Sequence, residues 1–295
     1  MPVVPTIFFL SDYGAEDEFV GVVHAVIAAH APATRVIDLT HHIPSFDVRA
    51  GSHTLRRAVR HLGAGVVLGV VDPGVGTARR GVALEVALPA GGTLCFVGPD
   101  NGLLVGAAEA VGEAPIGHAV ELRRDPPLLD RGATFDGRDL FAPAAAALSA
   151  GSPLVALGEA VEPESLVRLA GGVVQPGRLA DGRTCLRAEV TWVDHFGNLQ
   201  LAATVADARV AGIPSAGCVE LTARIETEGS YIDGLPQSLV PDGVQLRCVG
   251  AFGDLDRGEL GLLVDANGQL AVVAREASAA RWLNVAAGEL LVLAW

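Results

Sequence analysis

The sequence predicts two domains: an α/β N-terminal domain with a mostly parallel sheet (residues 1–172) and an all-β, barrel-like C-terminal domain (residues 179–295). Three observations predict this division. In the first half, short apolar runs alternate with helical spacing over ten or more residues, which is typical of βαβ units. In the second half, short alternating runs are separated by turn residues, which is typical of a small barrel or sandwich. Residues 151–178 are rich in Gly, Pro and Glu and are expected to connect the two.

The N-terminal elements follow from these patterns. Apolar runs predict strands at residues 5–10, 35–40, 65–71, 81–88 and 93–100. The spacing of apolar residues predicts helices at residues 19–32, 47–62, 101–112 and 138–151. Strands this apolar are typical of a sheet covered by helices on both faces, and parallel pairing is expected for most of them.

The C-terminal elements are expected to be strands alone. The predicted strand regions are residues 186–194, 199–205, 218–225, 260–274 and 289–295. Ala266, Asn267 and Gly268 interrupt one of these regions, and Asn-Gly is a strong turn signal.

The composition excludes several classes of protein. The formal net charge is −13, and all 21 basic residues are Arg. Without Lys the chain has no Walker P-loop, Schiff-base lysine or Ser-Lys pair. The acidity argues against nucleic-acid binding. The four cysteines lack metal-ligand spacing, so we expect neither a metal site nor a disulfide framework. Without a membrane-length apolar run or a leader sequence, the protein is expected to be soluble and cytoplasmic, with no membrane partner.

Three predicted strands of the N-terminal sheet end in loops that carry carboxylates. The residues are Asp12, Asp72 and Asp100, each followed closely by a glycine. Ligands of open α/β sheets bind outside the carboxyl ends of the strands. One such Asp is commonly only a turn or cap residue, but three at one edge favour a small-molecule site. The pair His41 and His42 lacks a recognised ligand spacing, so it does not predict a metal.

Six segments carry a family resemblance: SDYG, LTHHIPSFD, VVDPGVGTARR, GPDNGLL, ATFDGRDLFAPAAA and VDHFGNL. In this order and spacing the chain resembles the S-adenosylmethionine hydroxide adenosyltransferases, relatives of the fluorinase and chlorinase, from Phe8 to about Ser278. The resemblance implies an α/β domain followed by a β-barrel, and a homotrimer whose active sites lie between subunits. It also implies hydrolysis of S-adenosylmethionine to adenosine and methionine at ribose C5′, with no cofactor.

The resemblance also implies a role for individual side chains. Asp12 would hold the ribose hydroxyls, Asp194 would bind the methionine ammonium group, and Asn198 would hydrogen-bond the adenine edge. A carboxylate accepts two vicinal hydroxyls well, and an amide offers both a donor and an acceptor. The other substrate-binding residues implied around the ligand are Asp17, Phe46, Phe135, Phe196 and Phe252.

The implied catalytic residues are Asp72, Arg79 and Asp136. The hydrolases of this family use an Asp, an Arg seven residues later, and a His from a later loop to activate water. Asp72 and Arg79 match the first two, and the halogenases carry Tyr at the position of Asp72. Asp136 departs from the pattern, because it stands where the His is expected. We predict either that Asp136 replaces the His at the water or that it only caps a turn.

Two alternatives remain open from the sequence. The first is a halogenase that makes 5′-halo-5′-deoxyadenosine, for which Gly137 would leave room beside the nucleophile. The second is a non-catalytic protein that binds adenosine or S-adenosylmethionine, since the expected His is missing. Asp72 together with Arg79 favours the hydrolase. Arg80 is expected to form a structural salt bridge instead.

Overall fold

The computed structural model describes residues 5–111, 115–124, 132, 134–213, 220–226, 231–232, 235–236 and 244–295. The chain forms two compact units, Met1–Leu169 and Ala170–Trp295. Their boundary falls inside the Gly- and Pro-rich stretch from which we predicted a connection.

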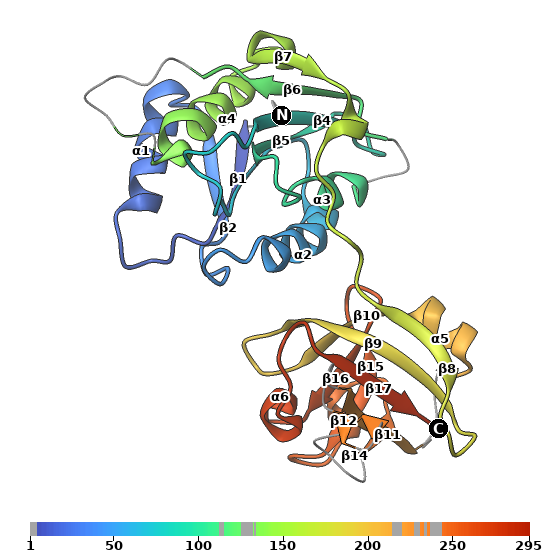
Figure 1. Cartoon of the computed structure of the whole chain (residues 1–295). Coiled ribbons are helices and arrows are strands. Elements are labelled where there is room, and N and C mark those ends of the chain that lie inside the picture. Colours follow the sequence, from blue (N-terminus) through green and yellow to red (C-terminus); the bar gives the residue numbers. More distant parts are fainter. Residues whose placement is uncertain are drawn as a thin grey trace. The chain divides into compact units, whose positions relative to one another are not determined.

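The N-terminal unit is built on one seven-stranded sheet, of order β2-β1-β3-β5-β4-β6-β7 (Figure 1). Four strands pair in parallel: β2 (Arg35–Thr40), β1 (Thr6–Ser11), β3 (Gly65–Val70) and β5 (Thr93–Pro99). The other three pair antiparallel: β4 (Gly81–Ala87), β6 (His118–Leu122) and β7 (Gly158–Val161). The five predicted strands are therefore all present.

The prediction of a mostly parallel sheet holds for one half of the sheet only. Strands β4 and β5 form a hairpin, because residues 88–92 are too few for the crossover that parallel strands need. Gly91 and Gly92 close this connection at φ values of 88° and 92°, which glycine adopts without strain. Strand β7 lies in the stretch that we expected to connect the two domains.

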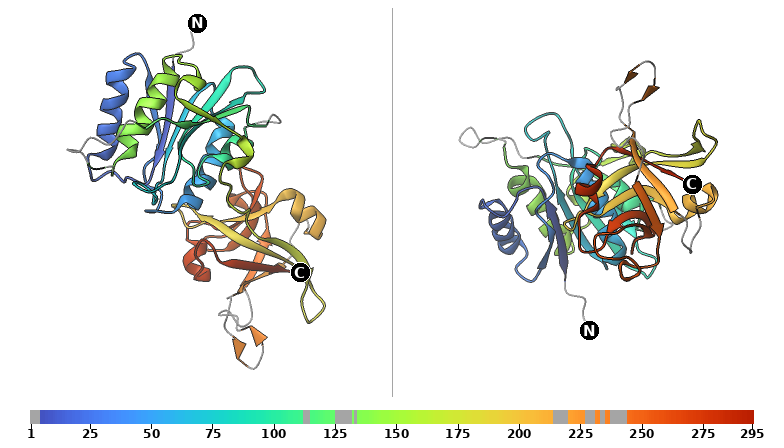
Figure 2. Two further views of the ribbon diagram at one scale, coloured as in Figure 1. Left: turned by 45° about the horizontal axis from the view of Figure 1, so that its top comes forward. Right: turned by 90° about the horizontal axis from the view of Figure 1, so that it is seen from below.

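Helices cover both faces of this sheet (Figures 1 and 2). On one face, α1 (Phe19–His30) and α4 (Ala142–Ser149) pack together over β1 and β3. On the other, α2 (Val48–Ala58) packs against the short α3 (Val105–Glu109). The buried side chains of α1, α4 and the strands form one core, which holds the carboxyl edge of the sheet in place.

The C-terminal unit is a curled sheet, of order β10-β16-β15-β14-β11-β17-β9-β8. The additional pairing of β10 with β9 joins strands from both ends of this order. Its strands are β8 (Val174–Arg178), β9 (Thr184–Val193), β10 (Leu199–Thr204), β11 (Glu220–Glu226), β14 (Val244–Cys248), β15 (Leu260–Val264), β16 (Gln269–Ala274) and β17 (Leu290–Ala294). Alternate strand residues fill its apolar core.

The sequence prediction missed several C-terminal elements. These are β8, β14, the small hairpin of β12 (Tyr231–Ile232) and β13 (Leu235–Pro236), and the helices α5 (Val205–Ala211) and α6 (Ala279–Leu283). The predicted strand at residues 218–225 begins outside the described residues. The predicted turn is present: Gly268 donates to Asp265 O at 3.0 Å and separates β15 from β16.

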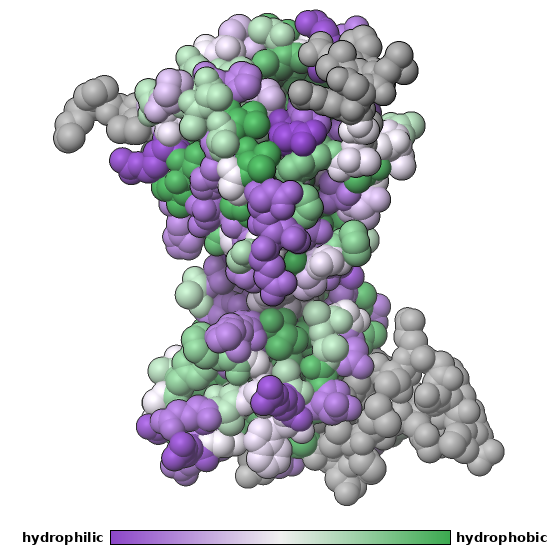
Figure 3. Space-filling model, turned by 90° about the vertical axis from the view of Figure 1, so that its left-hand side faces the viewer, coloured by the Kyte–Doolittle hydropathy of each residue, from purple (hydrophilic) through white to green (hydrophobic). Residues whose placement is uncertain are grey.

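No helix among the described segments is long and apolar enough to cross a membrane. Figure 3 shows one face of the molecule, on which hydrophilic and hydrophobic residues are interspersed in both units. Cys95, Cys185 and Cys248 are free thiols, and Cys218 lies outside the described residues.

Candidate active site

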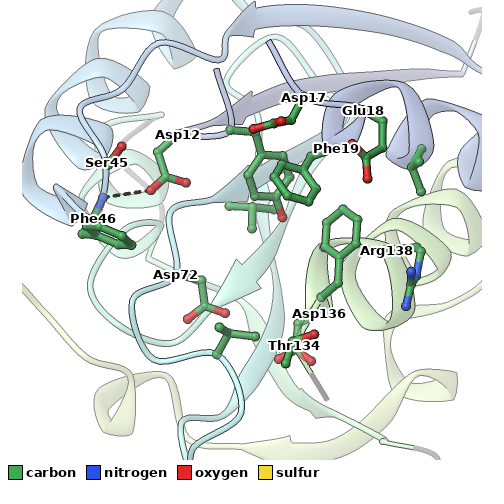
Figure 4. A pocket seen from close by; sticks show the side chains of 16 residues that line it. Asp12, Asp17, Glu18, Phe19, Ser45, Phe46, Asp72, Thr134, Asp136 and Arg138 are labelled. Atoms are coloured by element: carbon green, nitrogen blue, oxygen red, sulfur yellow. Dashed lines mark hydrogen bonds between the residues drawn. The ribbon is translucent and has the colours of Figure 1, made fainter. Parts of the chain in front are cut away.

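A pocket of about 640 Å³ opens at the carboxyl ends of β1 and β3 (Figure 4). Loops that are distant in sequence form its walls: the loop after β1, the start of α1, the Ser45–Phe46 turn, the end of β3 and the loop before α4. The predicted residues that line it are Asp12, Asp17, Phe46, Asp72, Phe135 and Asp136. The fold therefore gathers these six side chains around one cavity.

Asp72 and Arg79 come together because the chain turns back directly after β3. Thr77 N donates to Gly74 O at 3.2 Å, and Thr77 Oγ1 donates to the same oxygen at 2.6 Å. This compact turn returns Arg79 to the strand end. Arg79 Nε donates to Asp72 Oδ1 at 3.0 Å, and Arg79 Nη2 donates to Asp72 Oδ2. The charge at the end of the buried strand is thus paired within seven residues.

Arg79 also joins Asp72 to Asp136. Its Nη2 donates to Asp136 Oδ2 at 2.6 Å, and its guanidinium lies 5.3 Å from the centre of the Phe141 ring. The side chains of Arg79, Asp72 and Asp136 are only 8%, 7% and 6% exposed. Buried charges persist only when they are paired and hydrogen-bonded, as these are.

Arg124 is a fourth member of this cluster, which sequence reasoning missed. Its Nη1 donates to Asp136 Oδ1 at 2.8 Å and its Nη2 to Asp136 Oδ2 at 2.6 Å. Asp136 begins a π-helical turn, Gly137–Phe141, but its side chain makes no capping hydrogen bond. The alternative that Asp136 merely caps a turn is therefore wrong. The doublet of arginines directly after β6, like Arg79 and Arg80 before β4, was the only sequence signal for Arg124.

The two carboxyls of the cluster have pKa values that shift in opposite directions. Burial raises the pKa of Asp72, and the charge of Asp136 adds to this against the opposing effect of Arg79. Burial alone would also raise the pKa of Asp136, but hydrogen bonds from Arg124 and Arg79 outweigh it and lower that pKa. Environments that separate two carboxyls in this way assign them different roles in acid–base chemistry.

Asp12 fixes the turn that carries Phe46. Its Oδ2 accepts a hydrogen bond from Phe46 N at 2.9 Å, as the dashed line in Figure 4 shows. Phe46 has a φ of 69°, which is uncommon for a bulky residue, and its ring is 72% exposed at the pocket. The Asp12 carboxylate thus holds a strained backbone and an apolar ring beside the cavity.

Aromatic rings form the wall beside Asp136. Phe135 contacts Tyr13 and Phe19 edge to face, with centroid separations of 5.7 and 5.2 Å. A Cβ built on Gly137 would lie 2.0 Å from Tyr13 Oη. Tyr13 thus occupies the room that we predicted at Gly137 for a larger nucleophile. Burial, with the negative charges of Asp12, Asp72 and Asp136, raises the pKa of Tyr13 and keeps the phenol neutral.

The third acidic loop is not part of the pocket. Asp100 Oδ2 accepts from Arg80 Nε at 2.9 Å, and Asp100 Oδ1 accepts from Val167 N at 2.8 Å. The prediction that all three carboxylate loops form one site is wrong for Asp100, which fastens the 165–167 segment to the sheet. The structural salt bridge predicted for Arg80 is confirmed.

The C-terminal unit carries a second pocket of about 640 Å³. Its lining includes Phe196, Asn198 and Phe252, all predicted from the resemblance, together with Arg275 and Ser278, which were not. The rings of Phe196 and Phe252 are 74% and 47% exposed. Such apolar rings beside a few polar groups are typical of a site for a flat, partly polar ligand.

Asn198 lines this second pocket and carries an unsatisfied amide oxygen. Its Nδ2 donates to Asp194 Oδ2 at 2.8 Å, which orients the amide. Its Oδ1 is buried and has no hydrogen-bond partner among the described residues. Buried acceptors are normally satisfied, so this oxygen is suited to a ligand donor.

Asp194 organises the loop that carries Asn198. Its Oδ1 accepts from Phe196 N and from Asn198 N, both at 2.9 Å. Asp194 does not line the pocket, unlike the two residues that it holds.

Four polar side chains lie together outside both pockets. His24 Nε2 and His41 Nε2 lie 2.9 and 3.1 Å from Asp38 Oδ1, and Ser11 Oγ lies 2.8 Å from His41 Nδ1. The ligand atoms of His24, Asp38 and His41 all lie within 4.8 Å of one another, close enough to hold a metal ion. Both histidine contacts to Asp38 are at hydrogen-bonding distances. The possible metal ligands around His41 include neither Asp12 nor Asp72.

Fold and site together define a class: a two-domain enzyme with a buried acid–base cluster on its α/β domain and an aromatic pocket on its β domain. Family models match both domains: the SAM hydroxide adenosyltransferase N-terminal domain over residues 7–158 and its C-terminal domain over residues 188–292. The chain belongs to the SAM hydroxide adenosyltransferase family.

Individual relatives agree with this assignment. The (R)-S-adenosyl-L-methionine hydrolase of Salinispora tropica is 46% identical over 292 residues, covering 99% of this chain and 98% of the relative. A fluorinase of an Actinoplanes species is 27% identical over 307 residues, covering 96% and 95%. The crystal structure of an uncharacterized conserved protein from Thermotoga maritima matches with a TM-score of 0.79 and 30% identity, covering 97% and 99%.

Proposed function

We propose that the chain hydrolyses S-adenosyl-L-methionine to adenosine and L-methionine by substitution at ribose C5′. The observation that carries this proposal is the buried Asp72–Arg79 pair at the pocket, in a chain 46% identical to a named (R)-S-adenosyl-L-methionine hydrolase. The substrate itself supplies the leaving group, so no cofactor is required.

In this reaction the oxygen of water forms a bond to C5′ while the C5′–sulfur bond breaks. The electron pair of that bond goes to the positively charged sulfur, so methionine leaves with a neutral sulfur and needs no general acid. The protein has to hold water in line with the carbon–sulfur bond and accept its proton. Both tasks fall to groups beside Asp72.

Asp72 is the proposed base. Its raised pKa makes it a stronger proton acceptor than an ordinary aspartate. Arg79 holds both carboxylate oxygens and supplies positive charge where hydroxide character develops. Asp136, whose pKa is lowered, stays ionised and supports Arg79.

The remaining pocket residues are proposed to bind the substrate. Asp12 would accept the ribose hydroxyls, with Phe46, Phe135 and Asp17 around the sugar and the methionine chain. Asp12, Asp17, Phe46 and Phe135 all line the same cavity as Asp72.

Adenine is proposed to bind in the second pocket. It would lie between Phe196 and Phe252, with its amino group donating to Asn198 Oδ1. The loop uses three acceptor positions of Asp194, and the fourth remains for the methionine ammonium group.

Halide transfer is the less favoured alternative. The carboxylates that line the pocket, Asp72 and Asp136 among them, oppose an anionic nucleophile, and Tyr13 fills the space at Gly137. A non-catalytic binder has no use for a buried base, which is costly to maintain.

Product identification tests all three functions. The purified protein is incubated with S-adenosylmethionine in ¹⁸O-labelled water, with and without chloride, and the nucleoside is identified by mass spectrometry. Adenosine with one ¹⁸O at C5′ supports the hydrolase, and a 5′-chloro nucleoside identifies a halogenase. Retention of intact S-adenosylmethionine without turnover would identify the binder.

We also propose a cytoplasmic homotrimer with active sites between subunits. The sugar-binding and adenine-binding residues lie on different units of the chain, which supports a site completed by a neighbouring copy.

A further inference from the structure

We propose that Arg124 is a positioning residue: it holds the Asp136 carboxylate toward Arg79, so that Asp136 supports Arg79 where a histidine was expected. The kinetic consequences rest on the proposed hydrolysis. The electrostatic role rests on the cluster alone and can be measured in the resting protein.

Arg124 binds the carboxylate of Asp136 through both of its terminal nitrogens. Two parallel hydrogen bonds, 2.8 and 2.6 Å long, join its Nη1 and Nη2 to the two oxygens of Asp136. This bidentate arrangement fixes the rotation of a carboxylate as well as its position. It leaves Asp136 Oδ2 facing Arg79 Nη2, which donates to it at 2.6 Å.

Charge balance explains why a second arginine is needed. Asp72 and Asp136 are both buried, and without Arg124 they would share the single guanidinium of Arg79. Two buried carboxylates beside one cation tend to retain a proton between them. With Arg124 the cluster holds two carboxylates and two guanidiniums. The charge of Arg124 then balances Asp136, and the charge of Arg79 remains to balance Asp72.

A neutral histidine would not need this partner, because its ring nitrogen accepts from Arg79 without adding charge. Aspartate at position 136 and arginine at position 124 therefore form a coupled pair. Replacing either Asp136 or Arg124 alone should therefore lower activity.

Arg124 is suited to a mutational test. Its side chain is 38% exposed, and it lies two residues beyond the end of β6, so its replacement leaves the apolar core intact. The adjacent Arg123 is exposed and makes none of the cluster hydrogen bonds, so Arg123→Gln is a matched control.

The first experiment follows the aspartate carboxyl carbons by ¹³C NMR during a pH titration, with Asp136→Asn to assign the signal. In the wild type Asp136 should titrate below the ordinary aspartate range. In Arg124→Gln its pKa should rise by about one unit or more, Arg124→Lys should lie between, and Arg123→Gln should match the wild type. An unchanged Asp136 titration in Arg124→Gln would overturn the inference, whether or not the protein is a hydrolase.

The second experiment measures kinetics. Arg124→Gln should lower kcat about tenfold, with KM nearly unchanged, since one lost charge-assisted pair is worth roughly a factor of ten or more. The acid limb of kcat should move to higher pH, and Arg124→Lys should restore part of the activity. A kcat profile that superimposes on the wild type would overturn the kinetic part of the proposal, even with the NMR shift present.

The third experiment tests the coupling of positions 124 and 136. Asp136→His alone places an imidazole against two guanidiniums and should be poorly active. The double variant Arg124→Gln/Asp136→His should be more active than either single variant. Additive losses in the double variant would count against a coupled pair. If the wild type itself releases no adenosine, the proposed function fails while the NMR result still decides the role of Arg124.

Discussion

At the scale of single residues, the protein places charge where a buried strand ends. Asp72 is tolerated there because Arg79 returns to it within one compact turn, and Arg79 in turn reaches Asp136. The resulting carboxyls have opposite pKa shifts, so one is suited to accept a proton and the other to remain ionised. The cluster is therefore asymmetric in function although its two carboxylates are chemically identical.

Asp72→Asn should remove turnover while leaving substrate binding. We expect kcat to fall by about a thousandfold or more, because the base is lost but the isosteric amide keeps the shape of the pocket. Adenosine release measures turnover, and calorimetric titration with S-adenosylmethionine measures binding. The exposed Asp181→Asn is the control and should match the wild type. Equal loss of binding and turnover would assign Asp72 to ligand contact instead.

The pH dependence of kcat should report the raised pKa of Asp72. Only the ionised carboxylate accepts a proton, so kcat should fall about tenfold for each pH unit below that pKa. Because the shift is upward, the acid limb should lie above the ordinary aspartate value of 3.8. Initial rates at saturating substrate between pH 3 and 9 provide the measurement. An acid limb below pH 3.8 would contradict Asp72 as the base.

At the scale of elements, the loops and the ends of the helices and strands that they join build the pocket, and close packing fixes them. The loop before α4 passes Tyr13 so closely that only glycine fits at position 137. The same loop carries Phe135 and Asp136, so its path determines both the aromatic wall and the second carboxylate. The small residue Gly137 therefore lets the chain pass close to Tyr13, and this path sets the positions of Phe135 and Asp136.

Gly137→Ala should destabilise the protein by about 1–3 kcal/mol, because its Cβ would meet Tyr13 Oη. Tyr13→Phe removes that oxygen, so the double variant should recover most of the loss. Urea unfolding measures both changes. Gly63→Ala, where an added Cβ meets no atom within 4 Å, is the control. A double variant as unstable as Gly137→Ala would show that another contact is responsible.

At the scale of the whole molecule, two units divide the proposed substrate between them. The pocket of the first unit holds the charged cluster, and that of the second holds aromatic rings and an unsatisfied amide oxygen. Under the proposed function, each of the two pockets of about 640 Å³ would take a different part of the substrate.

Mixed variants should reveal whether neighbouring chains complete each site. Asp72→Asn disables the first pocket, and Asn198→Ala weakens the second. If sites form between subunits, unfolding and refolding the two variants together at equal amounts should restore about one quarter of the wild-type rate, because each site draws its halves at random. Separately refolded samples, mixed afterwards, are the control. No gain on joint refolding would place the whole site within one chain.

Much of the fold was predictable because it depends on local patterns. All five predicted N-terminal strands are present, since apolar runs bounded by turn residues identify buried strands. The β4–β5 hairpin was not predicted, although a connection of five residues, 88–92, already excludes a crossover. Helices α5 and α6 escaped prediction because they are short and lie between strands.

The sequence by itself determined the polar loops at strand ends, and its family resemblance implied the pairing of Asp72 with Arg79 and the substitution of Asp136 for a histidine. Only the tertiary structure decided that Asp100 turns away from the pocket, that Tyr13 fills the space at Gly137, and that Arg124 balances Asp136. The physical reason is how far apart in the sequence the interacting residues lie. A strand or a turn depends on neighbours in the chain, whereas pairing of buried charges depends on side chains that only the completed fold brings within hydrogen-bonding distance.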